Sequence, residues 1–96
     1  MGETESQVED LAGRPNMYKV VLLNDDYTTM EFVVQVLMDI FHHPRDRAIE
    51  IMLKVHHEGA GVAGVYPYSV AETKAQKVHR LARKNGYPLR CTLEPA

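Results

Sequence analysis

The segment MYKVVLLNDDYTTMEFV, residues 17–33, decides the fold of this chain. It opens with a short run rich in β-forming side chains, which predicts a buried strand over residues 17–23. The polar run Asn-Asp-Asp at 24–26 ends that strand, because short polar side chains compete for backbone hydrogen bonds. Thr28 followed by Glu31 is a capping-box pattern. The segment therefore predicts a strand, a polar turn and the start of a helix.

Apolar periodicity and turn residues predict the remaining elements. Pro44 cannot lie inside a continuing helix, so it separates the first two helices. The expected elements are a strand at 17–23, helices at about 28–41 and 44–58, a bent or bulged strand at 61–66, a helix from Ser69 to about 85, and a strand at 89–93. This β-α-α-β-α-β order predicts a small α+β single domain. Three helices would pack on one face of a three-stranded antiparallel sheet.

The ends of the predicted helices carry further signals. Ser69 followed by Glu72 forms a second capping-box pattern. Gly59 and Gly86 are expected to terminate the second and third helices, because glycine adopts the left-handed conformation without a steric penalty. The third helix is expected to bury Val70 among its apolar positions.

Composition limits the class of protein. The 96 residues are 45% hydrophobic and 25% charged, as in an ordinary globular domain, and the net charge of −2 argues against a general nucleic-acid binder. Residues 1–16 are acidic and poor in large apolar side chains, so we expect a flexible extension before a domain at 17–96. No apolar run is long enough for a membrane span or a signal peptide, and a single cysteine fits a reducing compartment. We expect a cytoplasmic protein.

The residues offer little for catalysis or metal binding. There is no glycine-rich phosphate loop, and neither Ser6 nor Ser69 lies in a nucleophile elbow. Cys91 lies in an apolar strand, where a buried thiol is usually inert. The adjacent histidine pairs 42–43 and 56–57 lack the i, i+4 spacing that places two ligands on one helix face.

The polar run has more than one interpretation. Asp25 and Asp26 could form a polar turn, or they could be the acid and base of a glycoside hydrolase. Adjacent residues in an extended segment point in opposite directions, which favours one carboxylate facing a ligand and one supporting the turn. Asn24 adds a carbonyl acceptor, which suits an ammonium group. His56 borders the apolar face of the second helix, where it either bonds to backbone or water or accepts from a cationic ligand.

Five large apolar residues also have two interpretations. They would usually belong to the core, but methionine is also suited to a binding rim, because its flexible thioether adapts to different apolar partners. These residues are Met30, Val33, Met52, Val55 and Leu89.

Several segments, in order, resemble the signature of the ClpS family of adaptor proteins. They are NDDYT at 24–28, MEFV at 30–33, IML at 51–53 with VH at 55–56, GV at 64–65, VAETK at 70–74, PL at 88–89 and CTLE at 91–94. No single segment is decisive, but their shared order and spacing are highly specific. The resemblance covers about residues 15–96.

The resemblance implies a binding protein of the bacterial N-end rule pathway that performs no chemistry. Such adaptors bind substrates that begin with Leu, Phe, Tyr or Trp and deliver them to the hexameric AAA+ unfoldase ClpA, which feeds the ClpP peptidase. By motif, Asn24, Asp25 and His56 would contact the α-amino group, and Thr28, Met30, Val33, Met52, Val55 and Leu89 would line the side-chain pocket. Glu72, Thr73 and Lys74 would dock on the unfoldase N-domain. The extension at 1–16 would engage the unfoldase during delivery.

Two positions depart from the family pattern. Thr29 stands where many relatives have proline, and Ser69 stands where the residue is often acidic. These departures suggest a divergent or second copy of the adaptor. We expect a monomer with no cofactor, metal, nucleic acid or membrane partner. The alternatives are a small nucleic-acid- or ribosome-associated module, and a small hydrolase that uses Asp25 and Asp26.

Overall fold

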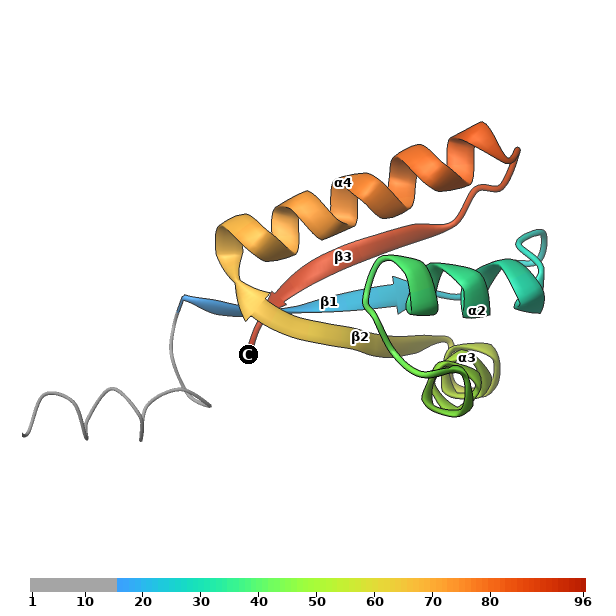
Figure 1. Cartoon of the computed structure of the whole chain (residues 1–96), viewed down its shortest axis with the longest axis horizontal. Helices are drawn as coiled ribbons and strands as arrows, with labels where there is room; N and C mark the ends of the chain where they lie inside the picture. Colours follow the sequence, from blue (N-terminus) through green and yellow to red (C-terminus); the bar gives the residue numbers. More distant parts are fainter. Residues whose placement is uncertain (1–15) are drawn as a thin grey trace, which may run out of the picture.

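The computed structural model describes residues 16–96, so the expected flexible extension, apart from Asn16, lies outside the described residues. Its elements are β1 (Met17–Leu23), α2 (Met30–Asp39), α3 (Arg45–Glu58), β2 (Ala60–Pro67), α4 (Tyr68–Lys84) and β3 (Arg90–Pro95). The predicted β-α-α-β-α-β order is confirmed. Figure 1 shows α4 running along β3, with α3 at the opposite edge of the sheet beside β2 and α2 between the two helices.

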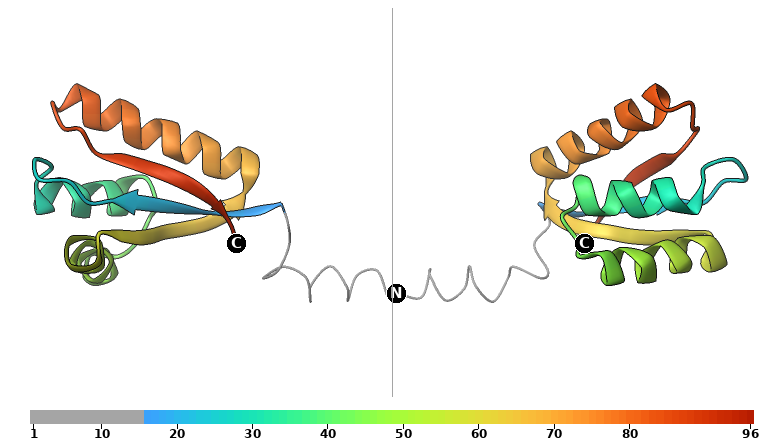
Figure 2. Two further views of the ribbon diagram at one scale, coloured as in Figure 1. Left: turned by 180° about the vertical axis from the view of Figure 1, so that it is seen from behind. Right: turned by 45° about the vertical axis from the view of Figure 1, so that its right-hand side comes forward.

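The first strand of the domain is the central strand of the sheet. The strand order is β2-β1-β3, and β1 pairs antiparallel with both neighbours. A backbone hydrogen bond joins the start of this strand to the last residue of the chain. The backbone N–H of Ala96 donates to the Met17 carbonyl at 2.9 Å, so the C-terminus lies beside the start of β1 in both views of Figure 2.

Strand β2 contains a bulge, as its glycines predicted. Val20 of β1 pairs with Gly64, but Val21 pairs with Val62, so Ala63 has no partner on β1. The ring of His43 bonds to this residue, with 2.6 Å between its Nε2 and the Ala63 carbonyl oxygen. The connection between α2 and α3 is thereby attached to the bulged strand.

The core lies between the sheet and the helices. Val20, Leu22 and Leu37 are fully buried. The opposite face of the sheet is more open, since Val62 and Val65 of β2 are exposed. Alternation along the strands accounts for this difference, because successive side chains point to opposite faces. The helices therefore cover one face of a three-stranded antiparallel sheet, as predicted.

The start of α2 differs from the prediction. Thr29, and not Thr28, is the N-cap residue, and its hydroxyl oxygen accepts from the backbone N–H of Phe32 at 3.1 Å. Thr28 instead donates its hydroxyl to Asp25 within the preceding loop. A local hydrogen bond within the loop thus uses the threonine that the capping-box pattern assigned to the helix.

The ends of α4 also test the sequence signals. The predicted capping box at Ser69 is wrong: the N-cap position is Pro67, and no side chain caps the helix there. Val70 is 40% exposed, so its predicted burial is wrong as well. The C-terminal signals are confirmed, because Gly59 and Gly86 have φ values of 90° and 80°, which glycine adopts without strain.

We expect the packing of α2 to control the stability of the domain. Leu37→Ala removes a fully buried side chain from α2 and should cost about 2–5 kcal/mol of unfolding free energy, because a cavity remains. Leu53→Ala is the matched control, since Leu53 is 40% exposed on α3 and its truncation should change stability by less than about 0.5 kcal/mol. Urea unfolding followed by circular dichroism measures both. Equal effects of the two substitutions would contradict this description of the core.

Candidate functional site

A cleft lies where the N-terminus of α2 meets the C-terminal half of α3. Its volume is about 390 Å³, within the range of small-ligand sites of ~300–1,000 Å³. It is lined by residues 24–29 of the loop, by Met30 and Val33 of α2, and by Met52, Val55 and His56 of α3. Segments about thirty residues apart in the sequence are thus brought together, as the predicted site required.

A backbone hydrogen bond places the two halves of the cleft. The N–H of Asn24 donates to the carbonyl of Gly59 at 2.9 Å, so the loop is attached to the residue that caps α3. His56 lies in the last turn of α3 and is exposed at the cleft. The C-terminal end of a helix carries partial negative charge, which favours a cation there. Asn24 and His56 thus lie at a mouth suited to a positively charged group.

Asp25 holds the loop in its shape. One carboxylate oxygen accepts from the N–H groups of Tyr27 and Thr28, at 2.8 and 2.7 Å, and the other accepts from the Thr28 hydroxyl at 2.8 Å. Burial alone would raise the pKa of the Asp25 carboxyl, but the bonds from Thr28 and Tyr27 outweigh it and hold the pKa below 3.8. An ionised carboxylate accepts about four bonds. About one acceptor position therefore remains for a ligand.

The opposite end of the cleft is apolar. Val33, Met52 and Val55 form its floor and are 7%, 8% and 2% exposed. Met30 differs, because its side chain is 46% exposed and stands at the rim. Leu89, which the resemblance placed in the pocket, does not line the cleft and lies fully buried in the core. The cleft thus combines a polar mouth with an apolar floor.

Three lining residues were not among the predicted site residues. They are Asp26, Tyr27 and Thr29, all from the loop. Tyr27 is 77% exposed, and the sequence signal for it was an aromatic residue inside a polar turn. Thr29 lines the cleft and caps α2 through its side chain, a bond that a proline at this position could not make. The departure at Thr29 therefore places a capping hydroxyl at the rim.

The residues predicted for docking lie on α4, away from the cleft. Glu72 and Thr73 are exposed, and within residues 16–96 their side chains bond to Tyr68 and Ser69 of the same helix. Lys74 is half-buried and donates from Nζ to the carbonyl of Ile40 at 2.7 Å. Burial lowers the pKa of the Lys74 ammonium, as does repulsion from the neighbouring Lys77. Lys74 thus joins α4 to the end of α2.

The same Lys74 ammonium lies over two aromatic rings. The distances from Nζ to the ring centroids of Phe41 and Tyr66 are 5.8 and 5.2 Å. Both separations fall within the range of cation–π attraction.

Catalytic and metal chemistry gain no support from the geometry. Burial raises the pKa of the Cys91 thiol to about 11, so it is a poor nucleophile at neutral pH. Its backbone N–H donates to Nε2 of His79 at 3.1 Å, which joins β3 to α4. Among residues 16–96, no three potential ligands of the His, Cys, Asp or Glu type gather into a metal site. Within the same residues, no helix is both long and apolar enough to cross a membrane.

Acid should loosen the loop through Asp25. A carboxyl whose pKa is lowered by folding stabilises the folded state above its unfolded pKa of ~3.9, and this contribution is lost as the pH falls through the folded value. Asp25→Asn should therefore lower the melting temperature at pH 7, and the difference from the unaltered chain should shrink below pH ~4. Asp26→Asn, at an exposed neighbour, is the control. A constant difference down to pH 2 would contradict the proposed role of the charge.

Comparisons with known proteins agree on a family. Residues 13–92 match the family model of the ATP-dependent Clp protease adaptor protein ClpS. The chain is 55% identical over 92 residues to an ATP-dependent Clp protease adapter protein ClpS of Wolinella succinogenes, covering 96% of this chain and 90% of that protein. A ClpS adapter of Syntrophus aciditrophicus is 54% identical, with 96% and 86% covered. These relatives are named as adaptors and not as enzymes.

A solved structure shares the same fold. The structure of Agrobacterium tumefaciens ClpS2 bound to L-phenylalaninamide superposes with a TM-score of 0.82 at 43% identity, covering 86% of this chain and all of that one. The family match spans most of the chain, and the fold and the sequence relatives point to the same group. The chain belongs to the ClpS family of ATP-dependent Clp protease adaptor proteins.

Proposed function

We propose that this adaptor binds the N-terminal residue of proteins that begin with Leu, Phe, Tyr or Trp, and delivers them to the ClpA unfoldase of the ClpAP protease. One observation carries the proposal: a single cleft has hydrogen-bond acceptors at its mouth and buried apolar side chains on its floor. A free α-amino group fits the mouth, and a bulky side chain on the same residue fits the floor.

The chemistry of the mouth suits an α-ammonium group. Such a group carries three N–H donors, and Asn24, Asp25 and His56 offer an amide oxygen, a carboxylate oxygen and an imidazole nitrogen. A hydrogen bond to a charged group contributes ~1.5–3 kcal/mol, and burial of a Leu or Phe side chain contributes a similar amount. After the cost of association, affinity on the order of micromolar follows.

The solved relative supports the class of ligand. L-phenylalaninamide, to which the Agrobacterium ClpS2 is bound, has a free amino group, an aromatic side chain and an amide in place of a carboxylate. It therefore has the groups found at the start of a peptide chain. The 43% identity of that protein to this one makes the same ligand class the natural choice here.

A free amino group should be required for binding. A fluorescent peptide beginning with Leu should bind at least about tenfold more tightly than its N-acetylated copy, because acetylation removes the charge and two of the three donors. Fluorescence anisotropy titration measures both affinities. Equal binding of the two peptides would exclude recognition of the amino group.

Two adjacent histidines provide a matched control for the same titration. His56 lines the cleft, whereas His57 does not, and both are exposed in the last turn of α3. His56→Ala should weaken binding of the free-amine peptide by about tenfold, and His57→Ala by less than about twofold. Similar losses in both variants would point to a general effect on α3 and not to a contact.

We also propose that α4 docks on the N-domain of the unfoldase. Glu72 and Thr73 are exposed on the surface of α4, and the Lys74 bond to Ile40 holds this part of α4 against the rest of the domain. The docking surface and the cleft lie on different elements, so one adaptor can hold a substrate while it contacts the unfoldase. Figure 1 shows α4 and α3 at opposite sides of the molecule.

A charge reversal on α4 should separate docking from substrate binding. Glu72→Lys should weaken binding to the isolated ClpA N-domain by at least about fivefold, because it places repulsion at the contact. Its affinity for the Leu peptide should not change. Glu50→Lys is the control, because it reverses the charge of an exposed side chain on α3, and it should leave N-domain binding intact. Loss of N-domain binding in both variants, or in neither, would contradict docking through Glu72.

A further inference from the structure

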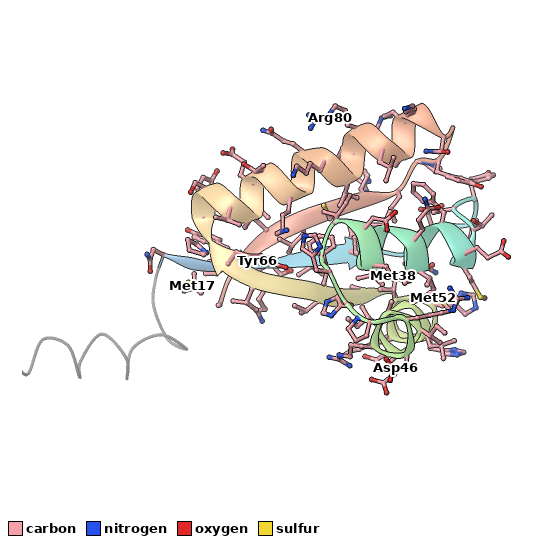
Figure 3. The ribbon with its side chains drawn as sticks, viewed as in Figure 1. Met17, Met38, Asp46, Met52, Tyr66 and Arg80 are labelled. Atoms are coloured by element: carbon pink, nitrogen blue, oxygen red, sulfur yellow. The ribbon has the colours of Figure 1, made fainter. Side chains whose placement is uncertain are left out.

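A second hollow follows the cleft along the line where α2 and α3 meet. Its volume is about 650 Å³, against about 390 Å³ for the cleft. We call it the seam groove and define it by Met30, Val34 and Met38 of α2 and by Ile49 and Met52 of α3. Figure 3 shows the labelled Met38 and Met52 on these neighbouring helices. The proposed binding of an N-terminal residue does not use this hollow.

The cleft and the seam groove share one wall. Met30 and Met52 line both hollows. Met30 is 46% exposed, although it lies among buried apolar residues of α2. An unbranched thioether that is not packed against the core can adjust to ligands on either side. A chain whose first residue occupies the cleft can therefore pass over Met30 into the seam groove.

We propose that the seam groove is a second subsite of the same substrate, which takes an apolar side chain at the third residue. This inference rests on the proposed function. Residues one and three of an extended peptide point to the same side and lie about 6.6 Å apart along the chain. Met30 and Met52 line both hollows, so a side chain two residues beyond the first one meets the groove directly across this shared wall. The third side chain then meets Val34, Met38 and Ile49.

The surface of the groove favours an apolar side chain over a charged one. Val34 is buried, and Met38 and Ile49 are half-buried, so these three residues offer hydrocarbon to a ligand, beside the exposed amide of Gln35. The charged residues of its lining, Glu31, Asp39 and Arg45, are all exposed to solvent. The groove also lies on α2 and α3, whereas the docking surface proposed above is on α4. Continuity with the cleft therefore favours the substrate as its occupant over the unfoldase.

The test uses two free-amine peptides that begin with Leu and differ only at residue three, which is Leu or Ser. The unaltered chain should bind the peptide with Leu at residue three at least about threefold more tightly than the peptide with Ser there. The reason is that burial of the leucine side chain in the groove removes apolar surface from water. Ile49→Ser should make the two affinities equal and leave the affinity for the peptide with Ser at residue three unchanged. Leu53→Ser, at an exposed position of α3 that lines neither hollow, should preserve the ratio.

A second measurement does not depend on any variant. With ¹³C-methyl methionine labelling, the Met38 signal of the unaltered chain should shift with the Leu peptide and not with the Ser peptide. Met30 and Met52 should respond to both peptides. Equal affinities for the two peptides, or an identical Met38 response, would overturn the inference. So would concentration-dependent self-association that Ile49→Ser removes, because the groove would then bind a second copy.

The two proposals fail in different ways. If neither peptide binds more tightly than its N-acetylated copy, the proposed function is wrong. If the free amine is required but residue three has no effect, only the second subsite is wrong.

Discussion

The central position of β1 is the constraint on which the rest of the structure depends. Because β1 pairs with both β2 and β3, its register fixes the whole sheet, and Val20 and Leu22 are fully buried beneath the helices. The strand ends at Leu23, and the next N–H, that of Asn24, is bonded to Gly59 at the end of α3. The loop that follows is thus fixed at the end of the central strand, beside the cleft between α2 and α3. The cleft is a consequence of where β1 stops.

The sequence predicted most of this architecture, because apolar periodicity reflects burial directly. The bounds of β1 and the buried face of α3, with Ala48, Ile51 and Val55, follow from such patterns. The errors arose at the starts of helices, where a short pattern fits more than one position. Thr28 satisfied a helix-cap pattern but bonds to Asp25, and Ser69 satisfied another but lies one residue inside α4. A capping pattern alone cannot show at which residue the helix begins or which nearby group a side chain bonds.

The site was predicted less completely than the fold. Asn24, Asp25 and His56 were named from a motif, and the structure brings them to one cleft. The motif did not show that Asp25 uses both carboxylate oxygens within its own loop, or that Leu89 lies in the core. The motif also did not show that the Lys74 ammonium donates to the carbonyl of Ile40, the residue that caps α2. Hydrogen-bond partners and depth depend on three-dimensional placement, which no sequence spacing contains.

The bulge in β2 has a consequence for the chemical state of one ring. Because a carbonyl oxygen only accepts hydrogen bonds, the contact with Ala63 requires that Nε2 of His43 carries the hydrogen. The neutral ring is therefore held in a single tautomer, with Nδ1 as its acceptor nitrogen. The residue that the bulge leaves without a strand partner thus selects the hydrogen-bonding form of the ring that attaches the helix pair to the sheet.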